Sequence, residues 1–129
     1  MNKIKIGEIF KILKTNNPKP VSELKYKSTF QLLIAVILSA QATDKSVNAA
    51  TSKLFKVAGT PKKLFNIGEE KLRAYIKTIG LYNAKAKNVI KTSKMILEKY
   101  NNKVPNNRDI LQELPGVGRK TANVVLNNA

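Results

Sequence analysis

The sequence has no cysteine and no histidine, and both absences exclude whole classes of chemistry. Without cysteine the chain can form no disulfide, no thiolate zinc site and no iron–sulfur cluster bound through cysteines. Without histidine it has no Ser-His-Asp or Cys-His nucleophile system and no imidazole metal ligand. We therefore predict no metal site and no cofactor in this chain. Acid, base or nucleophilic chemistry must use a carboxylate, a tyrosine, water or a lysine, and lysine is the obvious nucleophile.

Acidic residues and long apolar runs are also scarce. The 129 residues include 24 Lys and Arg against 8 Asp and Glu, a formal net charge of +16. This charge predicts a polyanionic partner, with nucleic acid favoured, although the codon bias of an A/T-rich genome could also enrich lysine. The longest apolar run, Leu32 to Leu38, is too short to span a bilayer, and the N-terminus lacks a signal peptide pattern. We expect a cytoplasmic protein that does not enter a membrane.

The apolar residues recur at helical spacing throughout, and no strand pattern is present. The length fits one globule, which we divide into an N-terminal helix and connector, 1–27, and a helical domain, 28–129. The first amphipathic helix is expected over 3–14. A capping box at Ser28 and Gln31 opens a buried, apolar helix. Later helices are expected after a cap at Thr43 or Asp44, from Thr60-Pro61, over 69–78 until Gly80 ends it, and from a cap at Asn83 to about Tyr100.

A helix-hairpin-helix motif is predicted over about 107–127. An apolar helix containing Ile110, Leu111 and Leu114 meets Pro115, and a second helix should begin near Arg119. Between them the Gly-x-Gly sequence permits backbone angles closed to other residues. Unpaired amides at the second helix start, together with the helix dipole, form an anion site. The motif therefore indicates binding to a nucleic-acid backbone, and its predicted DNA-binding residues are Gly116, Val117, Gly118 and Arg119.

A second segment repeats this pattern weakly. Gly and Ala have the same separation in residues 79–86 as in residues 115–122. The repeat predicts two similar turns on one surface.

Three motifs in this order resemble the endonuclease III family of DNA glycosylases with lyase activity. They are Leu38-Ser39-Ala40-Gln41-Ala42-Thr43-Asp44, Ile79-Gly80-Leu81-Tyr82-Asn83, and the hairpin that carries Lys120. The resemblance implies an all-α helical bundle with the DNA-glycosylase fold. It also implies a monomeric base-excision-repair enzyme that acts on oxidised pyrimidines or abasic sites in double-stranded DNA and extrudes the damaged nucleotide into a pocket.

The resemblance also implies roles for single residues. Lys120 corresponds to the nucleophile that attacks the sugar C1′, forms a Schiff base and leads to strand cleavage; without the resemblance it could equally hold a phosphate. Gln41 and Leu81 correspond to residues that intrude into the duplex. The alternatives are a polar helix end for Gln41 and a hydrophobic contact beyond a glycine cap for Leu81. Asp44 fits a helix cap better than a catalytic carboxylate.

The chain departs from the family pattern after the hairpin. The family has a catalytic Asp and four cysteines for a 4Fe-4S cluster downstream, and this sequence ends at Ala129 without them. We expect either a fragment of a longer enzyme or the product of a truncated gene. The alternative to a glycosylase and lyase is therefore a non-catalytic DNA-binding module. Val124, Val125 and Leu126 are expected to lack packing partners, which would fray the last helix and favour association.

Overall fold

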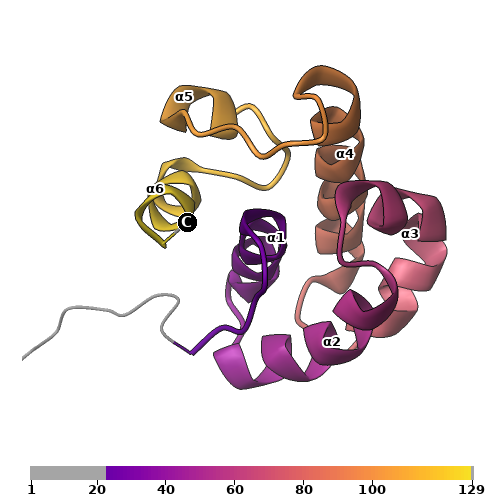
Figure 1. Ribbon diagram of the computed structural model, residues 1–129. Helices are drawn as coiled ribbons and strands as arrows, with labels where there is room; N and C mark the ends of the chain where they lie inside the picture. Colours follow the sequence, from indigo (N-terminus) through magenta and orange to yellow (C-terminus); the bar gives the residue numbers. More distant parts are fainter. Residues whose placement is uncertain (1–22, 129) are drawn as a thin grey trace, which may run out of the picture.

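The computed structural model describes residues 23–128, which form six α-helices and no strand (Figure 1). The helices are α1 Thr29–Ser39, α2 Asp44–Val57, α3 Pro61–Ile76, α4 Tyr82–Lys99, α5 Arg108–Leu111 and α6 Arg119–Asn128. The predicted all-α bundle is confirmed. The helix expected over 3–14 lies outside the described residues, and the division at residue 27 stays a prediction. No described helix is long and apolar enough to cross a membrane.

Helix α1 lies at the centre of the bundle, as its sequence predicts. Every residue from Phe30 to Leu38 is buried, and α1 packs against α2, α4 and α6 (Figure 1). The side-chain oxygen of Ser28 accepts a hydrogen bond from the Gln31 amide at 3.1 Å. Gln31 Oε1 accepts from the amide of Lys27 rather than that of Ser28, so the capping box is shifted by one residue. Because α1 is apolar all round, several helices can bury surface against it.

Two of the predicted helix starts are confirmed. The side chain of Thr43 caps α2 by accepting a hydrogen bond from the Ser46 amide at 3.1 Å. Asp44 is therefore the first helical residue and not the cap. Thr60 caps α3 in the same way. The boundary expected before residue 69 is a kink at Gly68, whose φ of 87° is open to glycine.

The start of α4 corrects the sequence prediction. The helix begins at Tyr82, and Leu81 occupies the cap position with φ 60° and no side-chain cap hydrogen bond, so Asn83 is not the cap. Because Leu81 adopts the left-handed conformation, the helix begins earlier than the cap expected at Asn83 would allow. Helix α3 likewise ends at Ile76, before Gly80, and the Ile79 amide donates to the Ile76 carbonyl at 2.8 Å.

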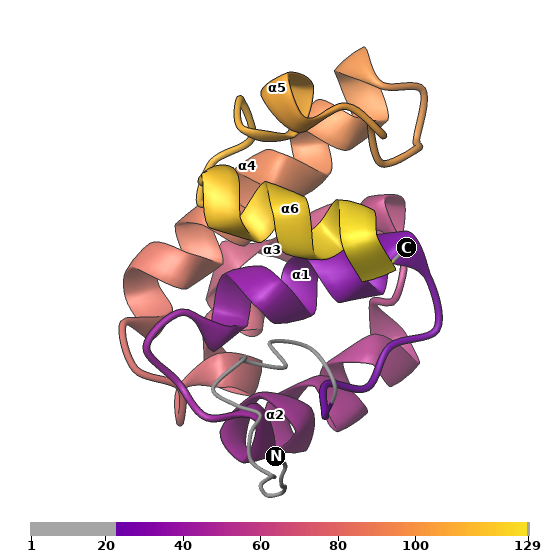
Figure 2. The ribbon, with the colours of Figure 1, turned by 90° about the vertical axis from the view of Figure 1, so that its left-hand side faces the viewer.

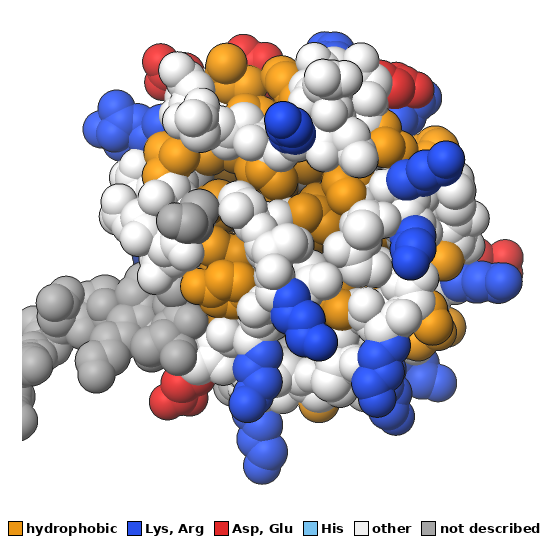
Figure 3. All heavy atoms as spheres, viewed as in Figure 1, with side chains coloured by type: hydrophobic (Ala, Val, Ile, Leu, Met, Phe, Trp, Pro, Cys, Tyr) orange, Lys and Arg blue, Asp and Glu red, His pale blue; other side chains and the backbone are white. Residues whose placement is uncertain are grey.

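The prediction for the last helix is also corrected. Val124 and Val125 are buried, because α1 offers an apolar face to α6. Leu126 is half-buried and lines a cavity of about 470 Å³ that also includes Val104 and Pro105. Figure 3 shows apolar side chains in a hollow on this face. The two valines therefore have packing partners within the described residues, and fraying of α6 does not follow from them.

Candidate nucleic-acid interface

Three connections that are far apart in the sequence lie on one side of the molecule. They are residues 40–43 after α1, residues 77–81 before α4, and residues 112–118 before α6. Figure 2 shows the end of α1 and the starts of α4 and α6 together at the left. A Cβ built on Gly80 would lie 3.9 Å from the carbonyl oxygen of Gln41, and one on Gly116 would lie 3.4 Å from Ile37 Cγ2. The three motifs of the sequence therefore form one surface.

The repeat between residues 79–86 and 115–122 is confirmed in position but not in backbone geometry. Each segment leads into a helix on this surface, α4 and α6 respectively. In the first segment the positive φ falls on Leu81, whereas in the second it falls on Gly116. The two turns therefore precede helices that start on the same side of the molecule, but their conformations differ.

The hairpin is anchored to the core by apolar side chains. Helix α5 has a single turn, capped by Asn107, whose Oδ1 accepts from the Ile110 amide at 3.1 Å. Leu111, Leu114 and Val117 are all buried. The amide of Val117 donates to the Leu114 carbonyl at 3.1 Å. Val117 therefore packs and closes the turn, and its predicted contact with DNA stays a prediction.

The two glycines of the hairpin have different roles. Gly116 has φ 82°, and a Cβ there would lie 3.2 Å from Asn88 on α4, so both conformation and space call for glycine. Gly118 has no positive φ, and a Cβ there would meet no protein atom within 4 Å. The expectation of unusual backbone angles is thus right for Gly116 only. The space at Gly118 lies open at the start of α6.

The start of α6 has the geometry of an anion site. The Ala122 amide donates to the Gly118 carbonyl at 2.9 Å, which is the first helical hydrogen bond of α6. The amides before it have no carbonyl within the helix, and the positive end of the helix dipole lies there. Arg119 and Lys120, the first two residues of α6, are both exposed. Lys120 is accessible to a ligand, and its geometry alone fits either a nucleophile or a phosphate contact.

Gln41 and Leu81 both project from strained positions. Gln41 has φ 56° and Leu81 has φ 60°, left-handed conformations that are uncommon for residues other than glycine. Both side chains are exposed, and that of Leu81 is 62% exposed although it is large and apolar. This exposure contradicts a packing role for Leu81. Strain of this kind persists where the surroundings impose it, often at functional sites.

One residue of this region was missed by the sequence analysis. Lys85 on α4 is only 5% exposed, and its Nζ donates hydrogen bonds to the carbonyl oxygens of Leu38 at 2.9 Å and Ala40 at 2.5 Å. Burial lowers the pKa of the Lys85 ammonium from its usual value by desolvation. A signal existed in the sequence, because Lys85 shares helical spacing with the buried residues Val89 and Ile96.

The acidic residues provide no metal site in the part of the chain that the structure describes. No group of three or more His, Cys, Asp and Glu side chains lies close enough to hold a metal ion there. The chain contains no cysteine and therefore offers no thiolate ligand for an iron–sulfur cluster.

Comparison with known families shows which superfamily the chain belongs to. Residues 34–126 match the family described as HhH-GPD superfamily base excision DNA repair protein. The chain belongs to this superfamily. The match includes all three connections of the interface, from the end of α1 to the start of α6.

Among HhH-GPD proteins, the chain is similar to endonuclease III. It is 60% identical to the endonuclease III of Haemophilus influenzae and to that of Escherichia coli over 129 residues, which cover 100% of this chain and 61% of each relative. The chain therefore spans less than two thirds of the length of these curated relatives. The resemblance identified from the three motifs is confirmed.

Solved structures confirm the DNA-glycosylase fold. A trapped covalent intermediate of endonuclease III with DNA has a TM-score of 0.81 and 49% identity, covering 85% of this chain and 52% of that chain. A non-covalent endonuclease III–DNA complex has a TM-score of 0.82 and 49% identity, covering 87% and 52%. A thermostable thymine-DNA glycosylase is more distant, with a TM-score of 0.72 and 27% identity, covering 77% and 46%.

Proposed function

We propose that this chain carries the DNA-binding and base-excising surface of a DNA glycosylase with AP lyase activity on oxidised pyrimidines or abasic sites in duplex DNA. The observation that supports it most is the position of Lys120, which is exposed in the first turn of α6. This helix starts on the side of the molecule where α1 ends and α4 starts, next to Gln41 and Leu81 in the sequence (Figure 2). The similarity to endonuclease III, of which a trapped covalent intermediate with DNA is known, favours the same function. Action as a monomer in the cytoplasm remains part of the proposal.

The hairpin would position the duplex. Phosphate oxygens accept hydrogen bonds from the first amides of α6, and Gly118 leaves space for a phosphate to approach. Contacts of this kind carry no base information, so the position on the duplex would be independent of sequence. Arg119 and the net charge of +16 add electrostatic attraction.

Gln41 and Leu81 would open the duplex. An exposed leucine can enter the base stack, because the apolar side chain gains burial there that the folded protein does not provide. The polar side chain of Gln41 would occupy the space left by the extruded nucleotide and hydrogen-bond with the base opposite. Both residues lie next to helices of the bundle, Gln41 after the end of α1 and Leu81 before the start of α4, and side chains placed on regular elements are positioned more accurately than those on long loops.

Lys120 would perform the chemistry on the extruded nucleotide. Its neutral amine attacks C1′ of the sugar, and the bond between C1′ and the base breaks so that the base leaves with the electron pair and gains a proton. The C1′–O4′ bond then breaks, O4′ gains a proton and the lysine nitrogen loses one, so that C1′ of the opened sugar and the lysine nitrogen form a Schiff base. Loss of a proton from C2′ then expels the 3′ phosphate by β-elimination, and water later releases Lys120.

A DNA-binding module without catalysis is the second candidate. An exposed lysine at a helix start is also the geometry of a phosphate contact. In that case the surface would bind abasic-site DNA but form no covalent bond.

Borohydride trapping separates the two functions. Residues 1–129 and a chimera in which they replace the matching part of E. coli endonuclease III would be incubated with duplex DNA containing an abasic site and then reduced. We expect the chimera to form a covalent adduct and to excise an oxidised pyrimidine. Binding without any adduct in the chimera would favour the non-catalytic module.

A further inference from the structure

Lys85 joins the two connections that carry Gln41 and Leu81. Its side chain crosses from α4 to the end of α1 and donates to the carbonyl oxygens of Leu38 and Ala40, the second of which directly precedes Gln41. Carbonyl groups at a helix end have no intrahelical partner, and a cation at that end is favoured by the helix dipole. The Lys85 ammonium therefore fixes the main chain between the end of α1 and Gln41.

The main chain of the same residue holds the other connection. The Lys85 amide donates to the carbonyl oxygen of Leu81 at 3.0 Å. Leu81 has no side-chain cap, so this helical hydrogen bond ties its left-handed turn to the first turn of α4. The two connections also lie close together, since a Cβ added to Gly80 would be 3.9 Å from the Gln41 carbonyl oxygen. Lys85 thus forms hydrogen bonds with both connections: with Ala40, directly before Gln41, and with Leu81 itself.

Space filling alone does not explain a lysine at this position. The side chain is 5% exposed, and a buried ammonium costs free energy that an apolar side chain of similar length would not. What the ammonium provides is a pair of directed hydrogen bonds to the end of α1. Groups that must be placed accurately are often held by such a supporting contact.

We propose that Lys85 is a positioning residue that sets the spacing between Gln41 and Leu81, so that both side chains enter the duplex at the same nucleotide step. The inference rests on the proposed function and extends it to a residue that itself touches no DNA. Without the ammonium, the end of α1 would lose two donors and Gln41 would move relative to Leu81. Undamaged DNA held by the hairpin would bind as before.

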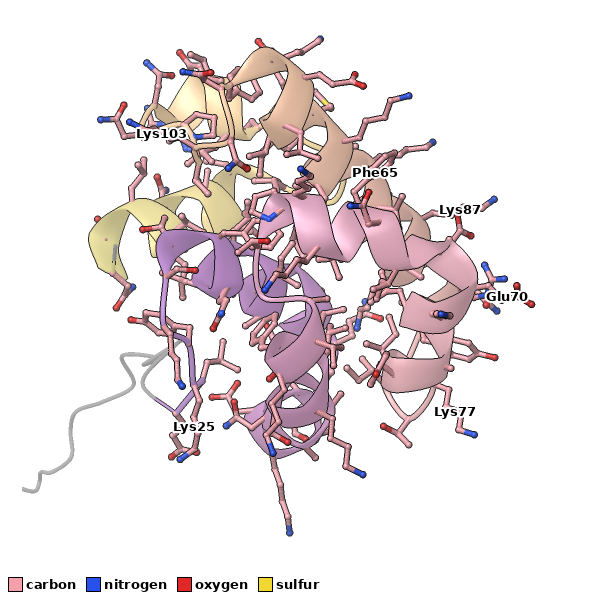
Figure 4. The ribbon with its side chains drawn as sticks, turned by 45° about the vertical axis from the view of Figure 1, so that its right-hand side comes forward. Lys25, Phe65, Glu70, Lys77, Lys87 and Lys103 are labelled. Atoms are coloured by element: carbon pink, nitrogen blue, oxygen red, sulfur yellow. The ribbon has the colours of Figure 1, made fainter. Side chains whose placement is uncertain are left out.

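The test compares Lys85→Met with Lys87→Met. Lys87 lies on the same helix but is exposed and points outward (Figure 4), so both variants lose one positive charge. Affinities of residues 1–129 would be measured for an undamaged duplex and for a duplex with a tetrahydrofuran abasic analogue opposite 2-aminopurine. We expect Lys85→Met to lose about tenfold in the preference for the abasic duplex and to weaken the 2-aminopurine signal of unstacking. Lys87→Met should keep both.

A mutant cycle distinguishes positioning from general stability. If Lys85 acts through Gln41 and Leu81, adding Lys85→Met to the double variant Gln41→Ala with Leu81→Ala should cause no further loss of preference. Equal losses in the two backgrounds would overturn the inference. Should Lys85→Met fail to fold, Lys85→Gln, which retains an amide donor, takes its place in the cycle. Lys85→Gln should lose less of the preference for the abasic duplex in the parent, and none in the Gln41→Ala, Leu81→Ala background.

The two proposals fail in different ways. A parent chain that does not prefer the abasic duplex would contradict the proposed function, and the role of Lys85 with it. A parent that prefers the abasic duplex, together with a Lys85→Met variant that equals Lys87→Met, would contradict the role of Lys85 alone.

Discussion

A Cβ on Gly116 would lie 3.2 Å from both Cβ and Nδ2 of Asn88, so the hairpin turn fits directly against α4. The Thr92 hydroxyl strengthens this attachment by donating to the Pro115 carbonyl at 2.9 Å. Because Gly116 also has φ 82°, Gly116→Ala should lower the free energy of unfolding by about 1–3 kcal/mol. Urea unfolding of the parent and the variant would measure this difference.

Gly118→Ala is the matched variant within the same turn. No protein atom lies within 4 Å of the added Cβ, so stability should change by less than about 0.5 kcal/mol. The methyl group would, however, fill space that the proposed phosphate contact needs, and affinity for duplex DNA should fall. A Gly118→Ala protein that binds DNA like the parent would show that no phosphate approaches this residue.

Lys120→Ala should abolish the borohydride-trapped adduct with abasic-site DNA in the chimera. The reason is that a Schiff base needs a primary amine, and the proposed amine is the exposed Lys120 at the start of α6. Lys120→Gln should retain much of the DNA binding, because the main-chain amides of the hairpin remain. Lys103→Ala removes an exposed lysine from the connection between α4 and α5 (Figure 4) and serves as the control. If Lys120→Ala is trapped as efficiently as Lys103→Ala, the nucleophile is a residue other than Lys120.

Replacing Gln41 or Leu81 with Ala should slow base removal far more than it lowers stability. Leu81 is 62% exposed and has little packing to lose, so its truncation should change the free energy of unfolding by about 0.5 kcal/mol or less. Excision by the chimera should slow because the extruded nucleotide is no longer replaced within the stack. The two measurements are the melting temperature and the single-turnover rate on an oxidised-pyrimidine duplex. A large fall in melting temperature with an unchanged rate would identify these as structural residues.

Sequence patterns predicted the elements of this surface better than their junctions. The apolar helix from Phe30 to Leu38 and the start of α6 near Arg119 follow from spacing and turn residues. The left-handed turns at Gln41 and Leu81 could not be predicted, because neither residue favours them and the tertiary structure imposes them. Because Leu81 takes the cap position of α4, the prediction of a cap at Asn83 was wrong.

Charged residues in the interior were equally hard to predict. Lysine is rarely buried, and the burial of Lys85 depends on carbonyl groups from α1 that are distant in sequence. The packing of Val124 and Val125 depends in the same way on the face that α1 presents to α6. Long-range partners, rather than local propensity, account for these differences.

The lowered pKa of Lys85 predicts a pH dependence of stability. Between its pKa in the folded protein and the usual value of 10.5, the unfolded chain binds more protons at this residue than the folded protein does. The contribution of Lys85 to the free energy of unfolding should therefore rise with pH across that interval. The parent should gain stability relative to Lys85→Met as pH approaches 10.5, which urea unfolding at several alkaline pH values would detect. A parent that loses stability relative to Lys85→Met as the pH rises would contradict the desolvation of this ammonium.

The affinity of residues 1–129 for duplex DNA should depend steeply on salt and little on sequence. If the +16 charge and the hairpin act together, log affinity should fall with log salt by about 0.9 for each phosphate neutralised. Arg119→Ala should reduce this slope by about 0.9, the contribution of one phosphate, since Arg119 lies exposed at the start of α6. Lys103→Ala should leave the slope unchanged, because residue 103 lies outside the three connections of the interface. Gel-shift titrations at several salt concentrations, with two unrelated duplex sequences, would provide all three comparisons. Equal slopes for the two variants would mean that charge attracts DNA to no particular face, as expected if the lysines reflect genome composition.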